Sequence, residues 1–451
     1  MKLSSLFIFC SFLSTILALP THNGGVTSLE ARNNDNGGQI DSRSNWVGSW
    51  TAMPQLCEPA NLPPAPFNAS SESDAVFVDA TLRQTIKLTL GGRGFRLRFS
   101  NAFGGTVLPI SSVSVACTSS FNGSNTGVST IDQTTIHPVT FNGGKEEYTI
   151  PTGSLAVSDP IEWAVQDGAL LSISMYLQDG QNGSAITAHP GSRTTSYLIS
   201  GNHTVDADLQ GATTVDHWYY ISGIEVVAER DDAAAIVVVG DSITDGRGSD
   251  TNENNRWTDD FATRIQQANL PLSVLNQGAG GNRILADGLG PNALSRIDRD
   301  VLAQTRVKYA IIFEGVNDIG TAANTSAAQA DVVEQLKEAY RQMVERLHAQ
   351  KIVVYAGTIT PFGNNSYDDP AGLRAASRVE VNDWLRNNSN SDRSGLFDGL
   401  LDFDAAVRDD SNGGKTLKPE YDVGGLSGDG LHPNPKGYHA MADSIPLELF
   451  Q

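Results

Sequence analysis

Between residues 45 and 230, apolar and polar side chains alternate over short runs that Gly, Asn and Pro separate. In the run 82–90, every second residue is leucine or isoleucine except Gln84, and the residues between them are charged or polar. The run 95–99 alternates in the same way after the glycine-rich segment 91–94. A side-chain period of two is typical of a half-buried strand, so we predict a hairpin over 81–103 with one face in water. Similar runs at 170–177 and 218–227, with no helical pattern between them, predict a β-sandwich.

Beyond residue 231, five continuous apolar runs alternate with helical stretches. The runs cover 233–239, 272–275, 309–313, 352–356 and 400–403, and the clearest helical spacing covers 327–350. Continuous apolar strands with crossover helices are typical of a parallel sheet covered on both faces. We therefore predict an α/β, doubly wound parallel sheet of flavodoxin-like order. Its ligand site should lie beyond the carboxyl ends of the strands.

One long apolar run stands at the start of the chain. It covers residues 6–17 and follows Lys2, which fits a signal peptide better than a membrane span. We predict a signal peptide over 1–18, a disordered or pro-segment over 19–44, a β-sandwich accessory domain over 45–230 and a catalytic domain over 231–451. The protein would then be secreted and extracellular.

The cysteine count agrees with secretion. Cys10 lies in the predicted signal peptide, which leaves Cys57 and Cys117. In an oxidising compartment two cysteines favour one disulfide, and two free buried thiols are the alternative. Asn-X-Ser/Thr sequons make seven residues candidates for glycosylation: Asn68, Asn122, Asn182, Asn202, Asn324, Asn364 and Asn387.

The overall charge narrows the class of partner. The 451 residues carry a formal net charge of −20, and 39% of them are hydrophobic, which fits a globular protein. The length favours two or three domains. A net anion is repelled by nucleic acid and by anionic membranes, so we expect no nucleic-acid partner and no stable membrane association. The sequence does not indicate the oligomeric state.

Four polar motifs follow the predicted strands or stand near the C-terminus: 240–246, 276–282, 315–318 and 429–433. Together they permit acyl transfer. A serine hydroxyl needs a base, and the best base near neutral pH is a histidine held by a carboxylate. Ser242, His432 and Asp429 provide this set. The oxyanion needs fixed donors, which the N–H groups of Ser242 and Gly281 and the side-chain amide of Asn317 can supply.

Other residues near these motifs have simpler interpretations. His348 and His439 are the other histidines after residue 231, and we prefer His432 to both as the base. Asp241 and Asp318 are expected to bond backbone N–H groups and shape their loops. Asp245 and Arg256 would form an ion pair or contact substrate. The segment 278–281 lacks the spacing of a dinucleotide loop, and the sequence has neither a Gly-x-Ser-x-Gly elbow nor a Walker A motif.

The four motifs resemble those of the SGNH/GDSL hydrolase superfamily, in family order. The matching residues are Gly240-Asp241-Ser242, Asn276 with Gly281, Gly315 with Asn317 and Asp318, and Asp429 with His432. The run 240–248, followed by Asn255-Arg256-Trp257, resembles a secreted subgroup of arylesterases and acylhydrolases that also carries an N-terminal β domain. The resemblance implies an SGNH hydrolase fold, with Ser242 as nucleophile, Asp429 and His432 as acid and base, and Gly281 and Asn317 as oxyanion donors.

We therefore expect a secreted serine ester hydrolase that works through an acyl-serine, without cofactor or metal. Its substrates would be small acyl esters, acetyl esters above all, of sugars or aryl alcohols, free or in a polysaccharide. One alternative is an extracellular lipase or phospholipase. An alternative of another class is a carbohydrate-binding protein whose hydrolase fold is inactive, which a serine-directed covalent probe would not label.

Overall fold

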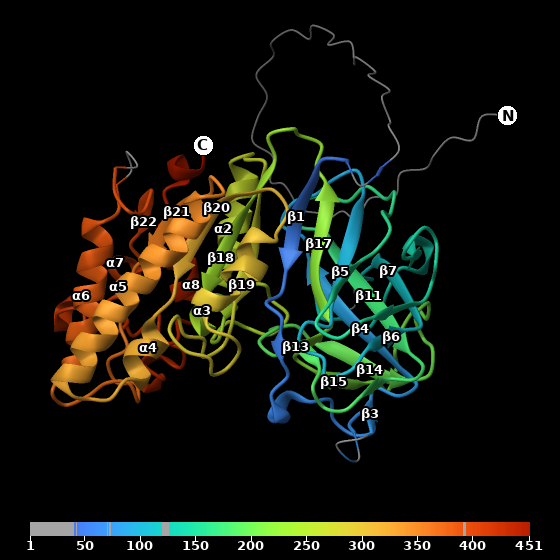
Figure 1. Cartoon of the computed structure of the whole chain (residues 1–451), viewed down its shortest axis with the longest axis horizontal. Helices are drawn as coiled ribbons and strands as arrows, with labels where there is room; N and C mark the ends of the chain where they lie inside the picture. The colour runs from blue at the N-terminus through green and yellow to red at the C-terminus, as the bar shows by residue number, and fades with distance from the viewer. Residues whose placement is uncertain (1–39, 42, 70, 72–73, 120–125, 391–393) are drawn as a thin grey trace, which may run out of the picture.

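The computed structural model describes residues 40–451 except 42, 70, 72–73, 120–125 and 391–393. Figure 1 shows an antiparallel β part and an α/β part side by side. The predicted signal peptide and most of the predicted segment 19–44 lie outside the described residues. Ile40 is buried against Trp46 and Val227, so contacts with the β part begin before residue 45. The domain boundaries stay predictions.

Two antiparallel sheets form the β part. The first has the order β1 (Trp46–Thr51), β17 (Ile221–Val227), β5 (Phe95–Ser100), β10 (Leu155–Val157). The second has the order β15 (Thr213–Val215), β14 (Ser196–Ser200), β4 (Ala80–Lys87), β11 (Leu170–Leu177), β7 (Ser112–Cys117), β8 (His137–Val139). Buried side chains of both sheets, such as Leu97 and Ile173, belong to one hydrophobic core. A β domain therefore precedes the α/β domain, as predicted.

Short strands complete the β part. They form a three-stranded sheet of β16 (Trp218–Tyr219), β13 (Thr187–His189) and β2 (Gln55–Leu56), and the pairs β12 (Gln181–Asn182) with β3 (Ala75–Val76) and β6 (Leu108–Ile110) with β9 (Tyr148–Ile150).

The predicted hairpin over 81–103 is wrong. Its two strands exist as β4 and β5, but β4 pairs with β11 and β14, whereas β5 pairs with β17 and β10. The chain crosses from one sheet to the other between them. The polar face of β4 is also buried: Arg83 donates to Ser174 Oγ and to the carbonyls of Ser129, His203 and Asp206. The alternation of apolar and polar residues therefore identified the two strands correctly. It did not identify the strands with which they pair, or the burial of their polar side chains.

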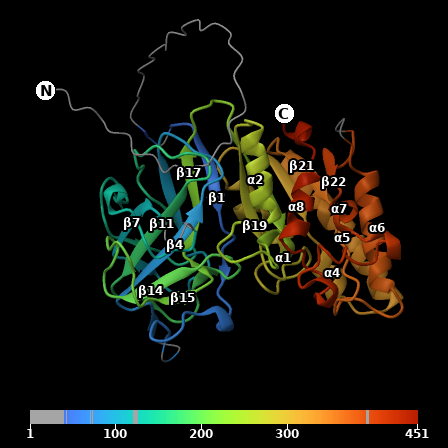
Figure 2. The same cartoon turned by 180° about the vertical axis from the view of Figure 1, so that it is seen from behind.

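The α/β part has five parallel strands in the order β19 (Leu272–Gly278), β18 (Ala234–Gly240), β20 (Val307–Phe313), β21 (Val353–Gly357), β22 (Gly399–Leu401). This order is the flavodoxin-like one, as predicted. The helices α2 (Trp257–Gln267) and α8 (Pro435–Asp443) pack on one face (Figure 2), and α5 (Ser326–His348) and α6 (Leu373–Asn387) pack on the other (Figure 1). Four shorter helices complete this part: α1 (Ser242–Asp245), α3 (Ala293–Ile297), α4 (Val316–Thr321) and α7 (Phe403–Val407). No helix in the described ranges is both long enough and apolar enough to cross a bilayer.

The two parts meet along β1 and β19. A side chain at Gly48 would place its Cβ 2.8 Å from Leu275 Cδ1, so the absence of one lets the strands approach. Thr51 Oγ1 donates to Asn276 O at 3.1 Å, and Gly48 N donates to Thr305 O at 3.2 Å. The β part is therefore bonded to the edge strand that leads into one of the predicted motifs.

The predicted Cys57–Cys117 disulfide is wrong, because Cys57 is a free buried thiol. Cys57 follows β2, and its backbone N–H donates to Ile186 O beside the three-stranded sheet. Cys117 ends β7 in the six-stranded sheet. Cys57 therefore lies beside one sheet and Cys117 lies in another, a separation that the number of cysteines alone cannot reveal. Burial raises the pKa of Cys57 to about 12, which keeps this thiol protonated.

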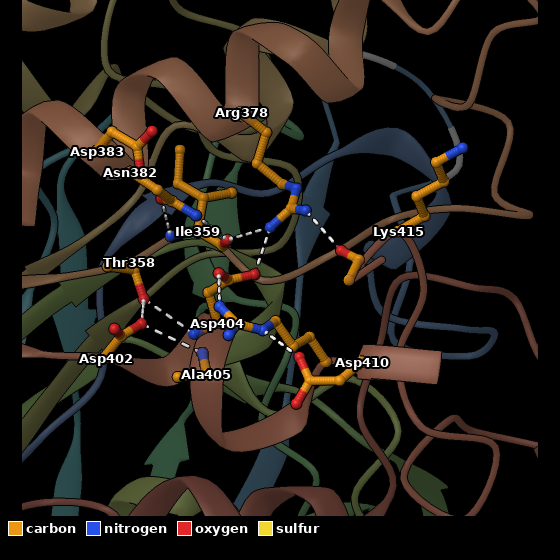
Figure 3. Close-up of polar contacts among 12 residues, drawn as sticks. Thr358, Ile359, Arg378, Asn382, Asp383, Asp402, Asp404, Ala405, Asp410 and Lys415 are labelled. Carbon is orange, nitrogen blue, oxygen red and sulfur yellow. Dashed lines mark hydrogen bonds and ion pairs between the residues drawn. The ribbon is translucent and has the colours of Figure 1, made fainter. Parts of the chain in front are cut away.

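A buried ion cluster fastens α6 and α7 to the end of β21 (Figure 3). Arg378 on α6 pairs with Asp404 on α7, and it also donates to the carbonyls of Ile359 and Gly414. Arg386 reaches the same carboxylate at 2.8 Å, and Thr358 Oγ1 accepts from the backbone N–H of Asp404. Each charge in this cluster has a partner, so its role is structural.

Asp404→Ala should lower the free energy of unfolding by about 3–5 kcal/mol, because it leaves the buried Arg378 guanidinium without its carboxylate. Urea unfolding followed by circular dichroism measures the change. The matched control is Asp383→Ala, since Asp383 pairs with Arg386 but its side chain is 61% exposed. It should cost no more than about 1 kcal/mol. Equal losses in the two variants would contradict a stabilising buried cluster.

Candidate active site

Three of the predicted motifs leave the parallel sheet at the same level. Gly240 at the end of β18 pairs with Gly278 of β19 and with Phe313 of β20. Ser242 then begins α1, Gly281 lies in the loop after β19, and Asn317 lies in the first turn of α4. Residues from all three segments line one cavity of about 760 Å³. The site therefore lies beyond the carboxyl ends of the strands, as predicted for this sheet order.

The structure brings Ser242, His432 and Asp429 together in a hydrogen-bonded chain. Ser242 Oγ lies 2.8 Å from His432 Nε2, and His432 Nδ1 lies 2.6 Å from Asp429 Oδ2. The other carboxylate oxygen accepts the backbone N–H groups of Leu431 and His432. Burial raises the pKa of Asp429, but the hydrogen bonds and charge of His432 outweigh it and lower this pKa to about 2. An ionised carboxylate therefore faces the ring, as a serine–histidine pair requires.

The helix that carries Ser242 is a single turn. Asp241 caps it by accepting the Ile243 N–H at 2.8 Å, and Gly246, with φ of 99°, ends it. The N–H groups of a first helical turn have no partner within the helix. The Ser242 N–H is therefore positioned as a donor, and the loop-shaping contact predicted for Asp241 is confirmed.

The two other predicted oxyanion residues line the same cavity. Asn317 Nδ2 donates to Asn282 O at 2.8 Å and Asn317 Oδ1 accepts from Tyr367 OH at 2.9 Å. These bonds fix the amide and leave its second N–H free to donate. Gly281 has φ of 71°, a left-handed conformation that favours glycine, and a Cβ there would lie 2.7 Å from Leu289 Cδ1.

Asp318 connects the oxyanion segments. Its two carboxylate oxygens accept the backbone N–H groups of Ile284 and Leu285, each at 2.9 Å, which confirms the predicted loop-shaping contact. Burial is the largest influence on this carboxyl and raises its pKa to about 6.

Sequence reasoning missed two buried charged residues beneath the nucleophile. Glu314 follows β20 and is buried beside the carboxyl of Asp241, and neither of its carboxyl oxygens has a hydrogen-bond partner among the described residues. Burial raises the pKa of Asp241 to about 7 and that of Glu314 well above its ordinary value. Arg296 donates to the carbonyls of Gly240 and Gln277 at the ends of β18 and β19. A charged residue directly after an apolar run was the available signal for Glu314.

The competing residues have other partners. His348 bonds Asp398 at 2.9 Å, and the exposed His439 bonds Asp260 at 3.3 Å. Neither histidine lines the cavity.

The predicted ion pair between Asp245 and Arg256 is wrong. Arg256 donates to the backbone carbonyl of Asp245 and pairs with Asp259, while the Asp245 carboxylate lies against His189 of the β part. No local pattern in the sequence indicates a partner so far away along the chain, since His189 and Asp245 are 56 residues apart. Asp245 does line the cavity, so the alternative of a substrate contact stays a prediction.

Both parts of the molecule form the cavity walls. The β part contributes Gln55, Glu58, Ala60, Asn61, Pro190, Gly191, Arg193 and His217, and the α/β part contributes, beside the residues above, Arg247, Gly280, Leu289, Asn365, Ser366, Tyr367 and Leu431. Across the described part of the chain, no three side chains of the kinds that bind metals are grouped closely enough to hold an ion.

Comparison with known proteins found one matching family model. The model of the GDSL-like lipase/acylhydrolase family matches residues 238–440, which include Ser242, Gly281, Asn317, Asp429 and His432. No curated protein is a significant match.

Solved structures similar to the chain cover about half of it. One is a member of the lipolytic protein G-D-S-L family from Veillonella parvula, 24% identical, over 48% of this chain and 98% of the other, with a TM-score of 0.33. Another is the lipase/acylhydrolase from Enterococcus faecalis, 22% identical, over 47% and 93%, with a TM-score of 0.34. A third is the acetyl xylan esterase AlAXEase, 19% identical, over 47% and 96%, with a TM-score of 0.33.

The raised pKa of Asp241 predicts a stability that falls as pH rises. Between the unfolded value of 3.8 and the folded value of about 7, the folded state holds a proton that the unfolded state has released. Asp241→Asn can still accept the Ile243 N–H and offers an N–H to Glu314, so its melting temperature should fall less between about pH 5 and about pH 8. Differential scanning calorimetry across this range measures the slope.

The surface variant Asp287→Asn is the control, because the pKa of Asp287 is lowered by its hydrogen bonds to Asn292. The contribution of Asp287 to stability changes only near and below the ordinary pKa of an aspartate, which lies outside this pH window. The same holds for Asp429, whose pKa is also lowered. Parallel slopes for the wild type and Asp241→Asn would contradict the prediction.

Proposed function

Residues 238–440 belong to the GDSL-like lipase/acylhydrolase family, a family of ester hydrolases, and from this premise we propose that the chain is a secreted serine esterase for small acyl esters of sugars or aryl alcohols. The observation that carries the proposal is the hydrogen-bonded chain from Ser242 through His432 to Asp429 at the cavity wall. A fold that had lost its activity would have no need to keep these three groups aligned.

In the proposed reaction, Ser242 Oγ attacks the ester carbonyl carbon while His432 Nε2 takes the hydroxyl proton. The carbonyl oxygen becomes an oxyanion, which the N–H groups of Ser242 and Gly281 and the amide of Asn317 stabilise. The bond to the alcohol oxygen then breaks, and His432 gives its proton to the leaving alcohol. An acyl-serine remains.

Water completes the cycle. His432 takes a proton from a water molecule as its oxygen attacks the acyl carbon, and the bond to Ser242 Oγ breaks when the second tetrahedral intermediate collapses. The serine regains its proton from His432, and the carboxylic acid leaves. Asp429 stays ionised throughout and stabilises the imidazolium that forms twice in each cycle.

The cavity lining supports a polar alcohol. Glu58 accepts from the amides of Gln55 and Asn61, and the buried Nε of Arg193 has no hydrogen-bond partner among the described residues. Such groups recognise hydroxyls better than hydrocarbon, which favours a sugar over a lipid. Apolar side chains are few here, and Leu289 lies directly against the oxyanion residue Gly281. A short acyl group, acetyl above all, is therefore the proposed acyl part.

Secretion is supported by the exposure of the sequons. All six predicted glycosylation sites that fall on described residues are exposed, namely Asn68, Asn182, Asn202, Asn324, Asn364 and Asn387, and Asn122 lies outside the described residues. Glycans attached at these positions would extend into solvent.

Ser242→Ala should abolish ester hydrolysis and leave the fold intact, because loss of one member of such a triad costs several orders of magnitude in rate. Hydrolysis of an aryl acetate measures the rate, and a phosphonate probe should label the wild type but not the variant. Ser411→Ala is the control, since Ser411 is exposed, does not line the cavity and belongs to no sequon. A variant that keeps more than about a tenth of the wild-type activity would remove Ser242 from this role.

For the substrate class, we expect aryl esters of short acids to be cleaved fastest and acetate to be released from acetylated xylan or pectin fragments. Few apolar side chains line the cavity, so a long acyl chain would gain little from burial. A chain-length series of aryl esters and an acetate assay test both points. Rates that rise steadily beyond about eight carbons, with no acetate released from any sugar, would favour the lipase alternative.

A further inference from the structure

The helix that carries Ser242 depends on the β part for its position. With four residues, α1 is far too short to be stable by itself. Its last residue, Asp245, is buried, and the Asp245 carboxylate meets His189 at the end of β13. The nucleophile and this carboxylate lie three residues apart in the same turn, so a shift of Asp245 would move Ser242.

His189 is placed between two groups that only accept hydrogen bonds. Its Nδ1 lies 3.0 Å from the carbonyl oxygen of Met53, and its Nε2 lies 2.9 Å from Asp245 Oδ1. The ring is 5% exposed and stacks on Trp218. A carbonyl cannot donate, so Nδ1 carries a hydrogen.

The second ring nitrogen requires a further proton. A neutral imidazole has only one N–H, and Nδ1 already uses it. A hydrogen bond at Nε2 as well therefore requires one additional proton, shared between the ring and the carboxyl of Asp245. The contact between His189 and Asp245 is therefore a buried hydrogen bond between the ring and the carboxyl group.

Residues of both parts enclose Asp245 on its other sides. A Cβ at Gly191 would lie 1.8 Å from Asp245 Oδ2, so only glycine lets the carboxylate approach here. Arg256 donates to the backbone carbonyl of Asp245 at 3.0 Å and also to the carbonyl of Ser192. A Cβ at Gly280, beside the oxyanion residue Gly281, would lie 3.7 Å from Asp245 Oδ2. The carboxylate thus lies between the β part and the oxyanion loop.

We propose that His189 is a positioning residue for the esterase reaction: its ring holds Asp245 and thereby fixes Ser242 Oγ relative to His432. This inference rests on the proposed role of Ser242. It makes the β part a component of the active site, because the nucleophile turn is aligned by a side chain that the α/β part does not contain. His189 itself touches no reacting atom.

Two substitutions separate the two contacts of the ring. In His189→Gln, the amide nitrogen takes the place of Nε2 and can donate to Asp245. In His189→Asn, the amide nitrogen takes the place of Nδ1 and can donate only to Met53 O. We expect His189→Asn to lower kcat on the order of 100-fold with KM nearly unchanged, since a misplacement near 1 Å can cost that much, and His189→Gln to lose roughly tenfold or less. Steady-state hydrolysis of an aryl acetate gives both constants.

The matched control is His203→Gln, which keeps the contact with the carbonyl and loses the contact with the carboxylate, as His189→Asn does. His203 also lies between a carboxylate, Asp206 at 2.6 Å, and a carbonyl, Ser200 O at 3.0 Å, but this pair is partly exposed and lies outside the cavity. Its kcat should equal that of the wild type. Gly191→Ala is an independent variant that displaces the carboxylate and leaves His189 in place. It should lower kcat roughly tenfold or more even where His189→Asn fails to fold.

Equal kcat in His189→Asn and His189→Gln, or wild-type kcat in Gly191→Ala, would overturn the inference. The Ser242→Ala variant separates this failure from that of the proposed function. If Ser242→Ala stays active, the proposed function fails whatever His189 does. If it is inactive while the His189 and Gly191 variants match the wild type, only the positioning role is lost.

Discussion

The parallel pairing of β18 with β19 and β20 is the constraint on which the candidate active site depends. Because Gly240 is level with both Gly278 and Phe313, three chain segments leave the sheet together. Each then turns at once into a loop or a short helix, so Ser242 and the two oxyanion residues reach one cavity. A slip of one residue in either pairing would turn the side chains of that strand to the other face and separate these groups.

Holding this edge of the sheet requires buried charge. Arg296 binds the carbonyls of Gly240 and Gln277, Asp241 caps the nucleophile turn, and Asp318 binds two N–H groups of the oxyanion loop. An unpaired charge would be very costly here, so each group is either hydrogen-bonded or protonated. The raised pKa values of Asp241 and Asp318 are the consequence. The site gains fixed geometry and gives up some stability at neutral pH.

The sequence predicts the features that a local pattern encodes. It does not predict contacts between segments that lie far apart along the chain. Continuous apolar runs located the five parallel strands and their order, and the motifs after them located the candidate triad. The partners of β4, by contrast, are β11 and β14, which lie far along the chain, and no local pattern encodes such pairing. The same reason explains the wrong disulfide and the unnoticed partner of Asp245. Glu314 was missed because a single carboxylate after an apolar run usually marks a strand end at the surface.

The contacts between the two parts bear on why a β domain precedes this α/β fold. A separate glycan-binding module would need only a linker, and a simple cover would need only apolar contact. Here hydrogen bonds connect the two parts beside the active site. They join His189 to Asp245, Arg256 to Ser192, and Thr51 to Asn276, which is the first residue of the oxyanion motif. The β part also supplies one wall of the cavity. Directional hydrogen bonds fix orientation as well as contact, so the β part is better understood as the second half of the active site than as an appended domain.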